Sequence, residues 1–314
     1  MTNFDKPDQD AVLTQLVRAY VRDQRRNRIG RLIFRVLLLV LFGLIGYALF
    51  SSDHMDRGGR LSSHVGLIDV QGTIADGQSA SAENFIAGLE DAYDNEHLKA
   101  LIVRIDSPGG SPVQADYMYN ALKYYRQKHP DVKTYAVCVD VCASAAYYVA
   151  AAADEIYANP SSMVGSIGVI YNGFGFVDTL QKLGVSRRLQ TAGVNKAFLD
   201  QFSPVKPQEE ATLQVMLDLV HQQFIDKVKA GRGDRLKIDD DIFSGLFWTG
   251  TQAKARGLID GFASSGEIAR DIIKLETIVD YTQKESVLDQ VAKNMGAELA
   301  GQLPKALGLK PGFQ

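Results

Sequence analysis

A serine, Ser144, occupies a position where a hydroxyl could act as a nucleophile. It precedes an alanine-rich segment, 145–153, and follows a predicted buried strand over 134–139. The N-terminus of a helix carries partial positive charge and unpaired N–H groups, which stabilise a developing alkoxide or oxyanion. The same pattern is also typical of a small serine that packs within an alanine-rich helix. The hypothesis of a nucleophile therefore depends on the other groups that a serine enzyme needs.

Two adjacent glycines could supply the oxyanion hole. Gly109 and Gly110 lie in the segment Asp-Ser-Pro-Gly-Gly-Ser-Pro at 106–112, directly after a predicted strand over 100–105. Glycines let the backbone turn and approach a ligand closely, and their N–H groups can converge on one point. An ordinary strand-to-helix turn is the alternative. The segment has neither the GK[ST] ending nor the GxGxxG spacing of a nucleotide-binding loop.

The serine also needs a base, and histidine is the usual one. The chain has five histidines: His54, His64, His97, His129 and His221. None lies in a motif-like setting, and a G-x-S-x-G elbow is absent, so a Ser-His-Asp triad has little support.

Lys196, in the semi-apolar segment 191–199, is the remaining candidate base. A lysine base must be neutral, so its pKa must fall from about 10.4 towards 7, which burial would bring about. By composition alone this position is typical of an exposed surface lysine, and a buried base is the less common alternative.

A third segment, 160–170, has small residues and glycines on either side of apolar residues. It could form the backbone of a substrate groove, with the Ser166 hydroxyl orienting a lysine; a tightly packed strand is the alternative. The two cysteines, Cys138 and Cys142, are interpreted as buried free thiols, although a disulfide between them stays open. Cys142 is an alternative nucleophile with no evident base. No cluster with the spacing of metal ligands is visible.

The N-terminal region predicts a membrane anchor. Seven arginines and one acid lie between Arg18 and Arg35, and the uncharged apolar run 36–50 follows. A bilayer core needs about 20 helical residues, and Arg35 can reach the headgroups. We expect one uncleaved transmembrane helix over 32–50, with a cytoplasmic basic arm over 1–31 and the rest outside the cytoplasm. A cleaved signal peptide and a buried core helix fit less well.

The remainder predicts one α/β domain over 65–280, after a linker over 51–64 and before a helical tail over 281–314. Strands alternate with helices, which is typical of a largely parallel sheet. Strands are expected over 65–70, 100–105, 134–139, 156–158, 167–171 and 257–260, and helices over 82–93, 113–127, 209–229 and 265–275. The net charge of −3 gives no reason to expect nucleic acid as a partner.

Five segments, in this order, resemble the signal peptide peptidase A family, also called protease IV, of membrane-anchored serine peptidases. They are IDSPGGSP at 105–112, ASAAYY at 143–148, AADEIYANPSSMVGSIGVI at 152–170, the lysine segment at 191–199, and FWTGTQAKARGLID at 247–260. The resemblance covers most of residues 65–275. It implies an α/β fold of the Clp protease and crotonase type, built of repeated β-β-α units.

The resemblance also implies a Ser-Lys dyad, with Ser144 as the nucleophile, Lys196 as the general base and Ser166 orienting the lysine. It implies hydrolysis of short hydrophobic peptides, such as released signal peptides, without a metal or cofactor. Family members form homo-oligomers in which the serine and the lysine of one site come from neighbouring subunits. Double-length members carry two such domains, and this chain has one.

For the oxyanion hole the resemblance implies Gly109 and Gly110 beside it and the Ala145 N–H as a further donor. The family usually has glycine where this chain has Ala145, and the added Cβ could narrow the site. This departure leaves a catalytically inactive membrane scaffold of the same fold as one alternative. An acyl-CoA enzyme of the crotonase type is the other, and the predicted anchor argues against it.

Overall fold

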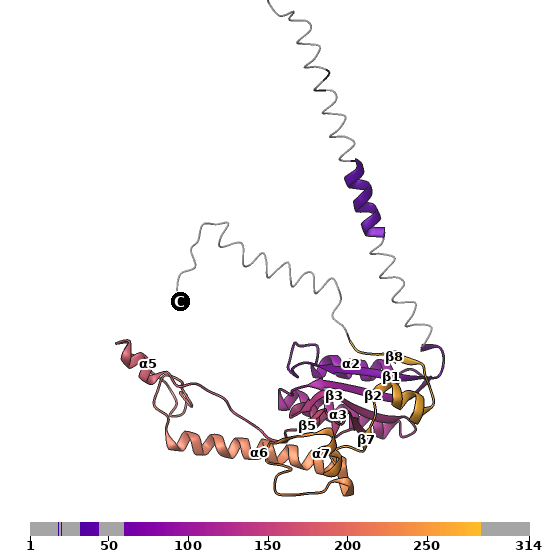
Figure 1. Cartoon of the computed structure of the whole chain (residues 1–314). Helices are drawn as coiled ribbons and strands as arrows, with labels where there is room; N and C mark the ends of the chain where they lie inside the picture. Colours follow the sequence, from indigo (N-terminus) through magenta and orange to yellow (C-terminus); the bar gives the residue numbers. More distant parts are fainter. Residues whose placement is uncertain (1–17, 19, 21–31, 44–59, 284–314) are drawn as a thin grey trace, which may run out of the picture. The chain divides into compact units, whose positions relative to one another are not determined.

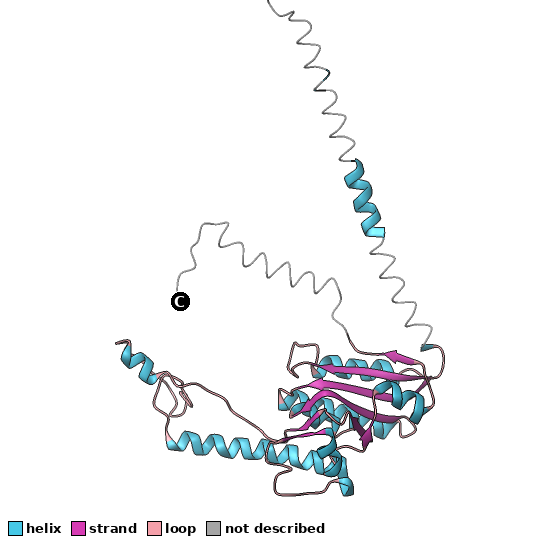
Figure 2. Cartoon of the chain, viewed as in Figure 1, coloured by secondary structure: helices cyan, strands magenta, loops and turns pink. Residues whose placement is uncertain are grey.

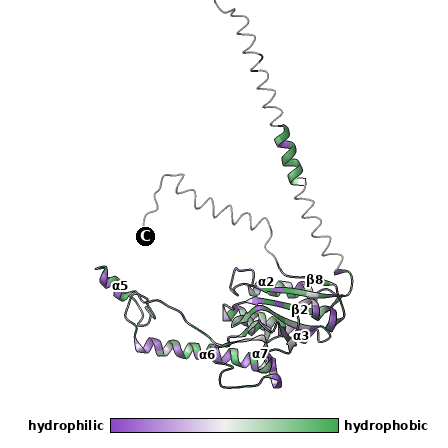
Figure 3. Ribbon diagram, viewed as in Figure 1, coloured by the Kyte–Doolittle hydropathy of each residue, from purple (hydrophilic) through white to green (hydrophobic). Residues whose placement is uncertain are grey.

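The computed structural model describes residues 18, 20, 32–43 and 60–283 of the chain, which divides into two compact units, 1–58 and 59–314. In the first unit, residues 32–43 form a helix that is hydrophobic along almost its whole length (Figure 3). Within the described residues, no helix is both long and apolar enough to cross a membrane. Residues 44–50 of the predicted anchor over 32–50 lie outside the described residues. Most of the predicted arm and linker, and the tail from 284 onwards, also lie outside the described residues.

The second unit is a mixed α/β domain built on an eight-stranded sheet (Figure 2). Its strands are β1 (His64–Gln71), β2 (Leu98–Ser107), β3 (Lys133–Ala143), β4 (Glu155–Ala158), β5 (Met163–Gly165), β6 (Phe247–Thr249), β7 (Gly261–Phe262) and β8 (Ile278–Asp280). The main order is β6-β5-β3-β2-β1-β8, and β4 joins β3 to β7. Every pairing is parallel except that of β5 with β6.

The helices connect these strands. They are α2 (Ala82–Tyr93), α3 (Pro112–Lys128), α4 (Ala145–Ala150), α5 (Val177–Lys182), α6 (Pro207–Arg232), α7 (Gly250–Ala255) and α8 (Ser265–Glu267), with a 3₁₀ turn η1 (Gly233–Arg235) and a π-helix η2 (Ile268–Ile273). Serine caps start α2 and α3: the Ser81 and Ser111 hydroxyls accept hydrogen bonds from N–H groups in the first turn. Pro112 then occupies the first helical position of α3, where its missing N–H costs nothing.

The sheet separates two hydrophobic clusters because side chains alternate between its faces. On β2, Leu101, Val103 and Ile105 join the larger cluster, to which α2, α3 and α4 contribute. Ala100 and Ile102 face the smaller cluster, which η2 covers. All six residues of α4 are buried, so the helix that follows Ser144 lies inside the core.

Most of the predicted elements are confirmed: the helix over 82–93 has the predicted bounds, and six of the other predicted elements lie within observed ones. Two predicted strands are wrong. Residues 167–171 have no regular structure, because pairing with β3 stops at Gly165 and Ser166 turns the chain at φ 51°. Residues 257–260 form a turn, and the strand follows at Gly261. The helix predicted over 265–275 is split into α8 and η2.

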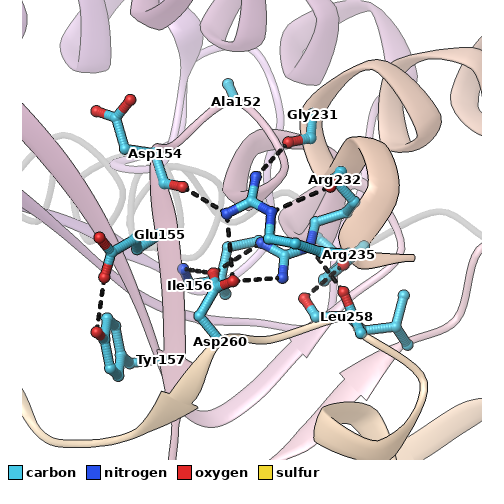
Figure 4. Close-up of polar contacts among 12 residues, drawn as sticks. Ala152, Asp154, Glu155, Ile156, Tyr157, Gly231, Arg232, Arg235, Leu258 and Asp260 are labelled. Atoms are coloured by element: carbon cyan, nitrogen blue, oxygen red, sulfur yellow. Dashed lines mark hydrogen bonds and ion pairs between the residues drawn. The ribbon is translucent and has the colours of Figure 1, made fainter. Parts of the chain in front are cut away.

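A buried ion pair attaches the C-terminal end of α6 to the sheet (Figure 4). The Arg232 side chain is 1% exposed and donates to both carboxylate oxygens of Asp260, at 2.8 and 2.9 Å. Arg235 and the Ile156 N–H donate to the same carboxylate, at 3.2 and 2.7 Å. Burial alone would raise the pKa of Asp260, but the hydrogen bonds from Arg232 and Ile156 outweigh it and hold the pKa below its ordinary value.

We predict that Asp260→Asn destabilises the domain by about 3–5 kcal/mol at pH 7, because it leaves Arg232 buried without a counter-charge. The folded-state pKa of Asp260 is depressed, so its contribution is complete above the unfolded pKa of about 3.9 and is lost as pH falls through the folded value. The difference in unfolding free energy between wild type and variant should therefore shrink below about pH 4. Denaturant unfolding across pH measures this.

Asp69→Asn is the matched control, because it removes a carboxylate that pairs with the half-exposed Arg104. Its cost should stay below about 1 kcal/mol. A loss of stability in Asp260→Asn no larger than that of the control would contradict the role given to the buried pair.

Candidate active site

Ser144 lies on a sharp turn between β3 and α4. Its backbone has φ 55° and ψ −127°, a conformation that L-residues adopt rarely and that costs of order 1–3 kcal/mol. The Ser144 N–H donates to the Gly165 carbonyl at 2.8 Å, which ties the turn to the end of β5. The residue is partly exposed while the helix behind it is buried. This strained turn presents the hydroxyl at the carboxyl edge of the sheet, as the geometry of a nucleophile elbow does, although the elbow sequence is absent.

The glycine loop after β2 lies directly against this turn. Gly109 has φ 101°, and a Cβ placed on it would lie 2.8 Å from the Ser144 Cβ and 2.9 Å from the Ala145 nitrogen. A Cβ on Gly110 would lie 2.1 Å from the Ile74 carbonyl oxygen on the other side of the loop. Both positions therefore require glycine, for space as well as for backbone conformation.

The loop and the turn offer two free N–H groups. The Gly109 N–H donates to the Ser107 hydroxyl at 3.1 Å. The Gly110 and Ala145 N–H groups have no hydrogen-bond partner in the described part of the chain. Gly110 and Ala145 therefore provide the available donors for an oxyanion, while Gly109 provides the close approach of the two segments.

These groups open onto a cavity of about 990 Å³. Ser144, Ala145 and Gly110 lie in its wall together with Ser166, the residue predicted to orient the lysine. Apolar side chains from α3 and α6 form much of the remaining lining: Val113, Tyr117, Val220 and Phe224. The cavity therefore combines the Ser144 hydroxyl on a strained turn, two free N–H donors and an apolar wall.

Lys196, the predicted base, is exposed and does not line this cavity. None of residues 168–208 is buried, and α5 with its flanking segments stands away from the sheet, at the N-terminal end of α6 (Figure 1). A single chain therefore brings Ser144, Ser166 and the two donors together and leaves Lys196 apart from them.

The structure places one imidazole in the cavity, which the sequence reasoning missed. His221 on α6 lines it, and its Nε2–H donates to the Ile167 carbonyl at 3.0 Å. His221 occurs three residues before Phe224 and seven before the buried Val228, so helical spacing alone places it on the inward face of α6. Its hydrogen bond fastens the 166–170 segment to α6.

Cys142, the alternative nucleophile, is fully buried. Burial, and then its hydrogen bond to Cys138, raise the pKa of the thiol well above its ordinary value. Because the thiolate is the reactive form, this cysteine is inert. Both cysteines are free thiols, and the described residues contain no cluster of three or more metal-ligating side chains.

Comparison with known families shows the class of protein to which this chain belongs. Residues 126–278 match the model of peptidase family S49, and residues 62–165 match that of Clp protease. A Synechocystis protein named "Putative protease" is 31% identical over 246 residues, covering 73% of this chain and 86% of its own length. The chain belongs to peptidase family S49. This confirms the resemblance seen in the sequence and places the chain among serine peptidases.

Two other relatives of this S49 chain differ in length. A Brucella abortus protein named Na(+)/H(+) antiporter NhaA is 44% identical over 194 residues, which cover 60% of this chain. The match spans only 26% of the length of that relative. An Enterococcus faecium protein named "Putative signal peptide peptidase SppA" is 29% identical over 231 residues, covering 68% of this chain and 65% of its own length.

We predict that Gly109→Ala abolishes peptide hydrolysis, with a loss of at least about 100-fold in kcat, because the new Cβ pushes the glycine loop away from Ser144 and Ala145. Gly77→Ala is the matched control: Gly77 also has positive φ (68°), but nothing lies within 4 Å of an added Cβ. Steady-state kinetics and thermal unfolding of both variants measure the effect. Wild-type kcat in folded Gly109→Ala protein would contradict the geometry described here.

Proposed function

We propose that this chain is a membrane-anchored serine endopeptidase that acts outside the cytoplasm with a Ser-Lys dyad. The Ser144 Oγ attacks the scissile carbonyl, and the neutral Lys196 amine takes the hydroxyl proton. The Gly110 and Ala145 N–H groups stabilise the tetrahedral oxyanion. The lysine then gives the proton to the leaving amine, and water hydrolyses the acyl-enzyme.

The single observation that carries this proposal is the meeting of Ser144, on its strained turn, with two unpaired N–H groups in one cavity. Family S49 membership supports acyl transfer to a serine and argues against an acyl-CoA enzyme. Ala145 contributes its N–H from the first position of a buried α4, and its side chain is packed in the core. The alanine in place of glycine is therefore compatible with a working oxyanion hole.

We place Lys196 in the site of a neighbouring subunit. The segment that carries it exposes large apolar side chains, including Ile170 at 83%, Phe174 at 71% and Val194 at 96%. Apolar surface of this extent is typical of an interaction site. A second copy of the chain packed on this segment would cover these side chains and bring a lysine to a cavity whose lining, among the described residues, includes none.

The substrates we propose are short hydrophobic peptides such as released signal peptides. The apolar wall formed by α3 and α6 supports this class, as does the name of the Enterococcus relative. The arginine cluster before the apolar helix over 32–43 supports the proposed topology, with the N-terminus in the cytoplasm and the peptidase domain outside. Lipid and other copies of the chain are then the partners.

Variants of the dyad test this mechanism. Ser144→Ala and Lys196→Met should each lose peptide hydrolysis by at least about 1,000-fold, because neither the nucleophile nor the base has a substitute. Lys182→Met, in the same exposed segment, is the matched control and should keep wild-type kcat/KM. Co-expression of Ser144→Ala with Lys196→Met should restore part of the activity, since mixed oligomers contain intact serine–lysine pairs. The lysine mechanism would be contradicted if Lys196→Met kept full peptide hydrolysis and His221→Gln lost it.

Reporter fusions test the topology. A periplasmic reporter joined after Ser63 should be active, and a cytoplasmic reporter at the same position should be inactive, because the arginines hold the N-terminus in the cytoplasm. The reverse pattern would contradict the proposed orientation. A product in cells that lacks residues 1–50 would instead indicate a cleaved signal.

A further inference from the structure

Two side chains in the cavity wall join the helix after the glycine loop to the helix after the nucleophile. The Tyr148 hydroxyl on α4 donates to the Asp116 carboxylate on α3 at 2.7 Å. Tyr148 is four residues beyond Ser144, and Asp116 is six residues beyond Gly110. At a rise of about 1.5 Å per residue, the bond lies about two helical turns or less from each oxyanion donor. The proposed dyad uses neither side chain.

Helix α6 and the rest of α3 hold the carboxylate in place. Lys227 on α6 lies 2.9 Å from the Asp116 Oδ1, and the Asn120 amide donates to Oδ2 at 2.8 Å. Lys227 also donates to the Asn120 carbonyl oxygen at 2.6 Å, which closes the network. Burial alone would raise the pKa of Asp116, but the hydrogen bonds from Lys227 and Tyr148 outweigh it and hold the pKa below its ordinary value.

Tyr148 stays protonated, so its hydroxyl can donate to the ionised Asp116 carboxylate. Burial, and then the Asp116 carboxylate, raise the pKa of Tyr148, so the hydroxyl keeps its proton and donates. A hydrogen bond to an ionised acceptor is roughly twice as strong as a neutral one. The Tyr148 ring also packs on Phe224, with centroids 5.0 Å apart, and edge-on against Tyr119 at 5.6 Å. Removal of the hydroxyl alone therefore leaves the ring in place.

We propose that the Tyr148–Asp116 hydrogen bond is a positioning contact for the oxyanion hole. It fixes α3 relative to α4 and thereby sets the separation of the Gly110 and Ala145 N–H groups. Those donors must lie about 2.7–3.1 Å from the oxyanion, and small displacements weaken stabilisation of the transition state more than binding of the substrate. The inference rests on the proposed function, because it needs a reaction that develops an oxyanion in this cavity.

The test compares two tyrosine hydroxyls from one interface. Tyr148→Phe should lower kcat about 10-fold and change KM by less than about twofold. Tyr119→Phe is the matched control, because its hydroxyl joins α3 to the Lys227 carbonyl at 3.3 Å without touching Asp116. The control should keep wild-type kcat. Asp116→Leu should lower kcat at least as much as Tyr148→Phe, and the double variant should be no slower than Asp116→Leu, since both changes remove one contact.

A second readout separates positioning from substrate contact. A peptide aldehyde forms a hemiacetal with Ser144 whose oxygen occupies the oxyanion hole, whereas the matching peptide alcohol does not. Tyr148→Phe should weaken the aldehyde about 10-fold, in parallel with the fall in kcat, and leave the affinity of the alcohol unchanged. Equal weakening of both would overturn the inference in favour of direct substrate binding.

Unchanged kcat and aldehyde affinity in Tyr148→Phe would also overturn the inference. The proposed function fails separately, if wild-type protein forms no hemiacetal at Ser144, and the inference then fails with it. If the wild type binds the aldehyde through Ser144 and Tyr148→Phe binds it with the same affinity, the proposed function stands and only the positioning role of the hydrogen bond is contradicted.

Discussion

The close approach of two loops at the carboxyl edge of the sheet is the constraint on which the site depends. Parallel pairing of β2 with β3 brings their C-terminal ends side by side. The loop after β2 then passes the turn after β3 so closely that Gly109 has no room for a side chain. This contact places two unpaired N–H groups beside Ser144, and these groups, together with the hydroxyl, could take part in a reaction in the cavity.

The packing of α4 and α6 holds the Ser144 turn in place against the glycine loop. Helix α4 is wholly buried, and a Cβ on Gly231 would lie 1.9 Å from the Ala151 carbonyl oxygen, so α6 packs directly on its C-terminal end. Arg232 and Asp260 hold this end of α6 to the sheet. The other end of α6 continues into the exposed segment with Lys196. One helix therefore connects the rigid nucleophile region with the segment that we assign to a neighbouring site.

Sequence reasoning recovered the parts that local patterns determine. The period of apolar residues gave α2 with its observed bounds, and glycines after a strand indicated the loop that meets Ser144. It missed His221: helical spacing places that residue on the inward face of α6, but which cavity this face lines depends on contacts between distant elements. It also did not show that the Ser107 hydroxyl occupies the Gly109 N–H, because that bond depends on the local geometry of the loop. The strand predicted over 167–171 failed because apolar content does not reveal that pairing ends at Gly165.

The most direct test of the account is covalent labelling of the full-length protein with a fluorophosphonate serine probe, followed by mass spectrometry of the labelled peptide. One adduct is expected, on Ser144, because that hydroxyl lies on the strained turn beside two oxyanion donors. The adduct should be absent from Gly109→Ala and present in Gly77→Ala. An adduct on another residue, or wild-type labelling of the Ser144→Ala protein, would contradict the assignment of Ser144 as the nucleophile.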